Sequence, residues 1–145
     1  MPGIIVGVDG SGDSRRALEW AMNEAAVQHV RLTVITVAPP VVGYWGVAYY
    51  REYQALVDQA QLVAEEAVEK VRAHLGDASP ASVTIQAVSG IAAEEMLNAA
   101  QNADMIVLGS RGTGRLSKRR LGSVSTQITY HARCPVVVIP PEDRG

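Results

Sequence analysis

The segment from Gly109 to Ser125 combines residue types that suit the binding of a phosphate group. Its glycines allow positive φ angles and let the backbone approach a ligand closely. Five of the thirteen basic residues of the chain fall within ten positions of this segment, namely Arg111, Arg115, Lys118, Arg119 and Arg120. The alternative is a flexible, solvated turn, because glycine-rich loops are common.

The same segment runs into a predicted helix that begins near Gly122 and Ser123. The first N–H groups of a helix have no partner within it, and together with the helix dipole they favour an anion. We expect Ser123 to cap this helix or to donate its hydroxyl to a phosphate oxygen. The sequence therefore predicts an anion site at this helix start.

The glycine spacings exclude two well-known nucleotide sites. Gly109 and Gly114 have the spacing of a Walker P-loop, but Arg115-Leu116 stands where the loop needs Lys-Ser/Thr. A dinucleotide fingerprint needs a third glycine after Gly10-Ser11-Gly12, and Arg15 occupies that position. Binding of NAD therefore has weak support.

Asp9 ends the first apolar run, in the sequence VGVDGSG. Its carboxylate could accept from a ribose hydroxyl or hold Mg²⁺ through phosphate. It cannot serve as the nucleophile of an Asp-x-Asp phosphatase, because Gly7 stands at the first Asp position. The alternative is that Asp9 only caps a turn, while Ser11 and Asp13 are better candidates for a helix N-cap.

The remaining reactive side chains predict no catalytic centre. His29, His74 and His131 are dispersed over predicted helices, and no His/Cys/Asp set has the spacing of a metal site. Cys134 precedes Pro135 at a strand start, where a cysteine behaves as a small hydrophobic residue. We therefore expect neither a catalytic residue nor a protein-held metal.

Five short apolar runs alternate with segments of helical period, which predicts the order β-α-β-α-β-α-β-α-β. The runs are Ile4–Val8, Leu32–Val37, Val83–Val88, Met105–Leu108 and Val136–Ile139. The helical segments centre on Ala17–Ala25, Leu56–Leu75, Ala92–Ala100 and Ser123–Ala132.

This alternation predicts an α/β fold with an open parallel five-stranded sheet and helices on both faces, forming one domain over residues 1–145. With the strand order 3-2-1-4-5, the winding reverses between strands 1 and 4, and ligands of such sheets bind beyond the carboxyl ends of the strands there. The two loops at that point, Asp9–Asp13 and Gly109–Gly122, are also the richest in glycine.

Composition excludes several other classes of protein. The chain has 145 residues, 48% of them hydrophobic, with a net charge of −2 and one cysteine, which argues against disorder and against a disulfide scaffold. A pI near 5.9 makes nucleic acid an improbable partner. The N-terminus lacks the features of a signal peptide or membrane span, so we expect no membrane association and a cytoplasmic location.

Five of the seven aromatic residues follow the second predicted strand, at Tyr44, Trp45, Tyr49, Tyr50 and Tyr53. One interpretation of this predicted loop is a satellite apolar cluster. The other is a lid, or a patch that docks an unknown protein partner, beside the ligand.

The last predicted strand, Val136–Ile139, is apolar and lies at the edge of the sheet. An exposed apolar edge tends to pair with another chain. We therefore expect a homodimer formed through this strand.

The pattern Gly109-x2-Gly112-x9-Gly122-Ser123, placed between a strand and a helix, resembles the nucleotide-binding motif of the universal stress protein family. The strand-1 ending Ile5-Val6-Gly7-Val8-Asp9 and the C-terminal run from His131 to Val138 are similar to that family as well. The resemblance covers nearly the whole chain. It implies ATP, with or without Mg²⁺, in the switch-point crevice, a homodimer, and a nucleotide-dependent regulator of the stress response with slow or no hydrolysis.

Carried over to this chain, the resemblance implies a set of ligand-binding positions. Gly7 and Asp9 would line the adenosine side, the backbone of Val37 and Ala38 would face adenine, and Leu108 and Gly109 would approach the ribose. Gly112, Thr113, Gly114 and Arg115 would wrap the phosphates, while Gly122, Ser123 and Val124, with Ser125, would offer N–H groups and a hydroxyl to phosphate oxygens. Ser110 and Arg111 complete the set of ligand-binding positions. Two alternatives remain: a true ATP-hydrolysing enzyme on the same fold, and an interaction module that uses Arg111–Arg120.

Overall fold

The structure is a computed structural model that describes residues 3–38, 46–110 and 122–141, with the backbone alone described at 46–52. Its strands are β1 (Ile4–Gly7), β2 (Leu32–Ala38), β3 (Val83–Ser89), β4 (Met105–Gly109) and β5 (Val136–Ile139). Its helices are α1 (Gly12–Gln28), α2 (Gly46–Leu75), α3 (Ala92–Ala99) and α4 (Ser123–His131), and a 3₁₀ turn spans Gly76–Ala78.

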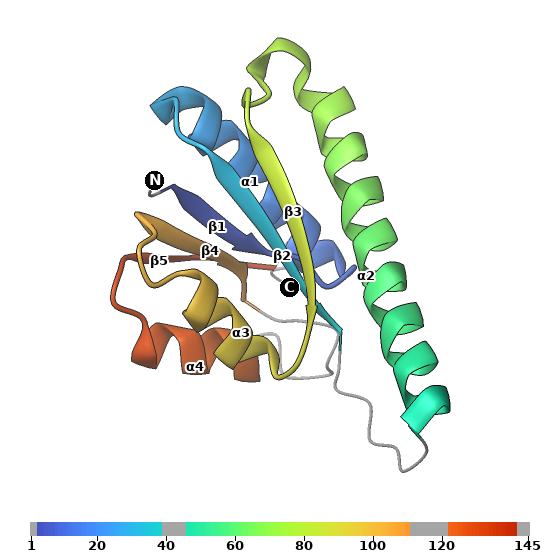
Figure 1. Ribbon diagram of the computed structural model, residues 1–145. Coiled ribbons are helices and arrows are strands. Elements are labelled where there is room, and N and C mark those ends of the chain that lie inside the picture. The colour runs from blue at the N-terminus through green and yellow to red at the C-terminus, as the bar shows by residue number, and fades with distance from the viewer. Residues whose placement is uncertain (1–2, 39–45, 111–121, 142–145) are drawn as a thin grey trace.

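The five strands form one parallel sheet in the order β3-β2-β1-β4-β5, as the sequence predicts (Figure 1). Val6 is paired with Val34 of β2 on one side and with Val107 of β4 on the other. These central residues are fully buried, which is the reason that the strands are continuous apolar runs rather than alternating ones.

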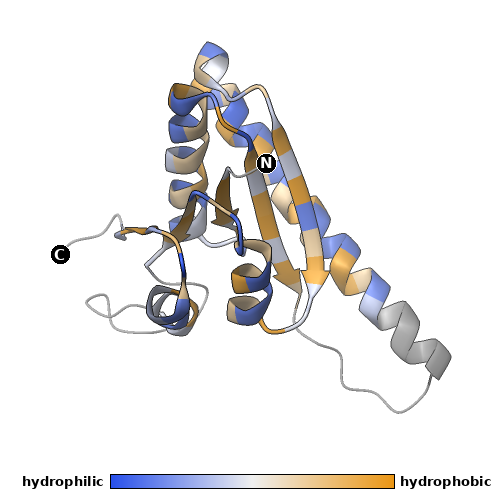
Figure 2. Cartoon of the chain, turned by 60° about the vertical axis from the view of Figure 1, so that its left-hand side comes forward, coloured by the Kyte–Doolittle hydropathy of each residue, from blue (hydrophilic) through white to orange (hydrophobic). Residues whose placement is uncertain are grey.

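Helices cover both faces of the sheet (Figure 1). On one face, α1 and α2 bury Leu18, Met22 and Val68 against the strands. On the other face, α3 and α4 bury Met96 and Ile128 against a second cluster that includes Ile106. Figure 2 shows the corresponding hydropathy, with orange dominating the strands and blue concentrated on the helices. The prediction of an α/β sheet with helices on both faces is confirmed.

The second helix begins earlier than the sequence analysis expected. α2 starts at Gly46, so Tyr49, Tyr50 and Tyr53 lie in a helix and the prediction of a loop was wrong for them. The apolar stripe of α2 continues backwards at helical spacing through Leu56 and Tyr53, which explains the additional turns. Tyr44 and Trp45 lie outside the described residues.

Within the part of the chain that the structure describes, no helix is both long and apolar enough to cross a membrane.

The edge strand β5 has four half-buried residues, Val136–Ile139, so it is only partly covered by its own chain.

Candidate functional site

The carboxyl ends of β1 and β4 meet the first turn of α1 in very close contact. A Cβ added at Gly109 would lie 2.9 Å from the backbone carbon and oxygen of Asp13. Gly109 is not among the described glycines with a positive φ, so the expectation that it supplies one was wrong. Glycine is needed here because the end of β4 packs directly on the backbone of α1.

The turn after β1 is held by a set of local hydrogen bonds. Gly10 takes a φ of 86°, a value that favours glycine. The Asp9 carboxylate accepts from the Ser11 N–H through Oδ1 at 2.9 Å, while the exposed side chain keeps Oδ2 free of hydrogen bonds to described residues. Asp9 therefore caps the turn and still presents one oxygen to solvent.

Ser11 is the N-cap of α1, since its hydroxyl accepts from the Ser14 N–H at 3.1 Å. The Ser14 hydroxyl is buried; it lies 3.2 Å from the Asp9 N–H, which donates to it, and 3.0 Å from the Ser11 carbonyl, which accepts from it. The sequence analysis missed Gly10 and Ser14 as residues that position Asp9. The capping pattern of Ser11 with a serine three residues later was the available signal.

On the other side of the crevice, Ser110 links β4, β5 and the start of α4. Its N–H donates to the Ile139 carbonyl at 2.9 Å, and its carbonyl accepts from the Gly122 N–H. The Ser125 hydroxyl donates to the same Ser110 carbonyl at 2.9 Å, with the Gly122 carbonyl at 3.2 Å. Ser125 is buried, and its hydroxyl links the end of β4 to the start of α4.

The Ser110 hydroxyl is the unusual group of this region. Ser110 is 6% exposed, and its Oγ has no hydrogen-bond partner among the described residues. A buried hydroxyl without a partner costs free energy, about 1–3 kcal/mol, so such a group is typically satisfied by something that binds beside it.

The start of α4 is capped by Gly122, not by Ser123 as the sequence suggested. Gly122 has extended backbone angles and no side chain caps the helix. Ser123 is the first helical residue and is exposed, and Val124 is half-buried. The first-turn N–H groups are thus left without a side-chain acceptor, which is the state in which a helix start attracts an anion.

The end of β2 presents its backbone to the same crevice at one residue only. Successive residues of a strand direct their N–H and C=O groups to opposite neighbours. The Ile35 carbonyl accepts from Val8 at 2.9 Å, and the Ala38 carbonyl accepts from Gly90 at 3.0 Å. Val37 therefore faces the space beyond the end of β1, whereas Ala38 faces β3.

Two further candidate residues pack within the core. A Cβ at Gly7 would lie 2.7 Å from the Met96 sulfur, so Gly7 makes room for the α3 side chain. Leu108 is 5% exposed and belongs to the cluster under α3 and α4. Both residues lie near the carboxyl ends of their strands, as the prediction requires, but the contacts described for them are with the core and not with the crevice.

The remaining candidates, Arg111, Gly112, Thr113, Gly114 and Arg115, lie outside the described residues, as do Lys118, Arg119 and Arg120. Where side chains are described, no group of three or more His, Cys, Asp or Glu residues could hold a metal ion. The described site therefore offers one carboxylate, one buried hydroxyl and two helix starts, which suits the binding of a polar, anionic molecule.

The comparisons with known proteins agree on one family. The model of the "Universal stress protein family" matches residues 2–140. Universal stress protein Rv1996 of Mycobacterium tuberculosis is 36% identical over 155 residues, covering 98% of this chain and 49% of the relative. The chain thus spans about half the length of the curated relatives that it matches.

Solved structures agree in fold. Universal stress protein UspA from Lactobacillus plantarum has a TM-score of 0.79 at 25% identity, covering 95% of this chain and 97% of that one. A universal stress protein in complex with cAMP has a TM-score of 0.68 at 24% identity, covering 96% of both chains. The Archaeoglobus fulgidus protein in complex with dAMP has a TM-score of 0.58 at 20% identity, covering 96% and 97%. With the family model and the Mycobacterium relative in agreement with the sheet order, the chain belongs to the universal stress protein family.

Proposed function

We propose that this chain binds ATP, with or without Mg²⁺, in the crevice between β1 and β4, and that it acts as a nucleotide-dependent regulator in the stress response. The observation that carries the proposal is the buried Ser110 hydroxyl without a described partner, beside the start of α4 that no side chain caps. Both features supply hydrogen bonds that a phosphorylated ligand uses.

The other described groups would share the rest of the ligand. The free Asp9 oxygen suits a ribose hydroxyl, and the Val37 N–H and C=O suit the edge of the adenine ring. Related proteins of the same fold are solved with cAMP and with dAMP, which share an adenine base and a phosphate. We place this activity in the cytoplasm, where ATP is available.

In this arrangement one Asp9 oxygen accepts from the β1–α1 turn and the other binds the ribose, and we assign the role of general base to no described side chain. Mg²⁺ would neutralise phosphate charge when it is bound with ATP. This chain's own residues bind and orient the nucleotide, so we expect slow or no hydrolysis. Turnover above about 1 per second in a steady-state assay would favour the enzyme alternative.

The proposal is tested by thermal unfolding of the full chain with and without ATP. We expect ATP at a hundred-fold excess over its Kd to stabilise the protein by roughly 2.7 kcal/mol. Gly122→Glu should abolish this shift, because it adds bulk and negative charge at the start of α4. Ser82→Glu, which adds the same charge at an exposed turn at the other end of the sheet, should retain it.

A wild-type protein that shows no ATP-dependent shift contradicts the proposal, and so does an equal loss in both variants. Circular dichroism of each variant confirms that the fold is kept. An interaction module based on Arg111–Arg120 would instead bind its partner without ATP, and that binding would fall steeply with added salt.

A further inference from the structure

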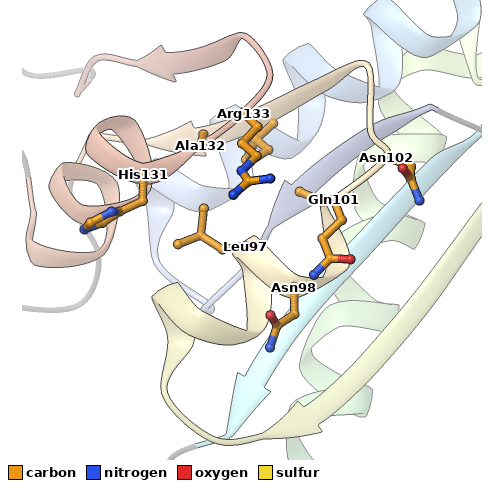
Figure 3. Close-up of a pocket in the computed structure, with 9 residues that line it drawn as sticks. Leu97, Asn98, Gln101, Asn102, His131, Ala132 and Arg133 are labelled. Carbon is orange, nitrogen blue, oxygen red and sulfur yellow. The ribbon is translucent and has the colours of Figure 1, made fainter.

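A cleft opens at the end of the sheet opposite to the nucleotide crevice, where α3 and α4 both end. Its volume is about 460 Å³, within the roughly 300–1,000 Å³ of small-molecule pockets. It lies between the C-terminal turn of α3 and the connection from α4 to β5 (Figure 3). No part of the proposed nucleotide site contributes to its lining.

One cationic side chain and three carboxamides, those of Asn98, Gln101 and Asn102, belong to the lining of this cleft. Figure 3 shows the Arg133 side chain reaching into the opening from the α4–β5 connection, with the Gln101 carboxamide in the segment after α3. His131 points away from them in the same view. Among the described residues no acidic side chain lines this cleft, so the Arg133 guanidinium can bind a carboxylate through two hydrogen bonds.

The two helix ends supply the opposite charge. At the end of α3, the Ala100 N–H donates to the carbonyls of Met96 and Leu97, at 3.0 and 3.3 Å. At the end of α4, the Ala132 N–H donates to the Ile128 carbonyl at 2.8 Å. C-terminal residues of both helices line the cleft, and the carbonyls there that lack a partner within the helix carry partial negative charge of roughly half an elementary charge at each helix end. Such carbonyls accept from an ammonium group.

Part of the lining is apolar. Leu97 and Ala132 line the cleft and are half-buried, and Ile106, which lines it as well, is fully buried. This surface suits a short aliphatic or aromatic side chain, while the polar groups lie around it.

We propose that this cleft binds a small zwitterion of the α-amino acid class with an apolar side chain. The carboxylate pairs with Arg133 and Gln101, the ammonium pairs with the carbonyl ends of α3 and α4, and the side chain covers Leu97 and Ala132. A simple anion suits the cleft less well, because the two helix ends repel it. The inference does not depend on ATP binding at the other end of the sheet.

The test is a titration of the ¹⁵N-labelled full chain by NMR, with L-leucine and L-phenylalanine as probes. We expect the amide signals of Leu97, Gln101, Ala132 and Arg133 to shift with either probe. N-acetyl-L-leucine lacks the ammonium and L-leucinamide lacks the carboxylate. The affinity for each should be at least roughly ten-fold lower than the affinity for leucine.

Arg133→Gln should weaken leucine binding roughly ten-fold, because it removes the charged partner of the carboxylate. Arg72→Gln is the matched control: Arg72 is another arginine at this end of the sheet, in the last turn of α2, and it lines neither this cleft nor the hollow beside it. Its loss should change the affinity less than two-fold, roughly. Gln101→Ala is a second variant, in case Arg133→Gln alters the NMR spectrum throughout.

Each of three results would overturn the proposal. The first is that neither amino acid shifts any amide signal at about 10 mM, which would mean a Kd too high for specific binding. The second is equal binding of leucine and N-acetyl-leucine, which would leave a simple anion site. The third is an equal loss in Arg133→Gln and Arg72→Gln, which would indicate a general effect of charge.

Discussion

At the residue scale, the candidate site depends on close packing as much as on side chains that carry charge. Gly109 brings β4 against the backbone of Asp13, and Ser125 ties the start of α4 to the end of β4. One carboxylate oxygen of Asp9 accepts a hydrogen bond within the turn, and the other stays exposed. These contacts set the width of the crevice before any ligand enters.

Replacement of Gly109 by alanine should destabilise the fold. The new methyl group would lie 2.9 Å from backbone atoms of Asp13, and overpacking of this kind costs about 1–3 kcal/mol. The measurement is the midpoint of urea unfolding without nucleotide. Gly12→Ala is the control, because a Cβ there meets nothing within 4 Å. Equal midpoints for the two variants would contradict the role assigned to Gly109.

Asp104 should control the reactivity of Cys134. Burial raises the pKa of the Cys134 thiol, and the negative charge of Asp104 raises this pKa further. Since the thiolate is the reactive form, alkylation by iodoacetamide should be slow at pH 8 and should accelerate as the pH rises.

Asp104→Asn removes the second cause, so the pKa of Cys134 should fall and alkylation at pH 8 should become faster. Asp77→Asn, at an exposed position in the 3₁₀ turn, is the control and should leave the rate unchanged. A rate that is the same in all three proteins would show that burial alone protects the thiol.

At the element scale, the two helices that start at the crevice begin in different ways. α1 has a serine cap whose hydroxyl accepts from the Ser14 N–H, whereas α4 starts at a glycine with no side-chain cap. Since no side chain competes for the first N–H groups of α4, the proposed function leads us to expect the phosphate at α4 rather than at α1.

The Ser11 cap should contribute measurably to stability. Ser11→Ala removes the acceptor of the Ser14 N–H and should cost about 1 kcal/mol in the free energy of unfolding. Ser123→Ala should cost almost nothing without nucleotide, because Ser123 is exposed and Gly122 holds the cap position. Chemical unfolding of both variants tests the pair, and a larger loss for Ser123→Ala would contradict this assignment.

The start of α2 shows where sequence patterns become ambiguous. Among its described side chains the first buried one is Ala64, and those from Tyr53 to Leu62 are exposed or half-buried. Glycine near the start of α2 is typical of loops, so the pattern there favoured a loop. Tyr53, Leu56 and Ala60 nevertheless continue the helical spacing of the buried stripe.

At the scale of the whole molecule, the sheet separates two regions of different chemistry. The carboxyl ends of β1 and β4 carry the crevice with Asp9 and Ser110, and the amino ends of β4 and β5 carry the cleft with Arg133. The helix α4 (Ser123–His131) runs between them. One domain over residues 1–145 stays a prediction, and the matched relatives are about twice as long as this chain.

The edge strand β5 leads us to expect a homodimer. The bonds Ile106 N–H to Pro135 and Ser110 N–H to Ile139 place the backbone of alternate residues on the β4 side, so Val138 presents its N–H to the open edge. An unpaired apolar edge favours association with a second copy. Light scattering at micromolar concentration should therefore show a dimer.

Val138→Pro should convert that dimer into a monomer that keeps its fold, because proline removes only the outward N–H and is tolerated at sheet edges. Val137→Pro is the comparison, since it removes an N–H that faces β4 and should unfold the protein. A wild-type monomer, or a Val138→Pro variant that stays dimeric, would show that β5 is not the interface.

The period of residues along the chain predicted the alternation of strands and helices, and the spacing of its glycine motif predicted the family, whose resemblance implied the strand order. The sequence could not determine that Gly109 is required by Asp13, that Gly122 rather than Ser123 caps α4, or that Ser110 has a buried hydroxyl without a described partner. It also could not show that Gln101 and Arg133 share a cleft. Those facts depend on distances between segments far apart in the sequence, and only the packing of the helices on the sheet sets these distances.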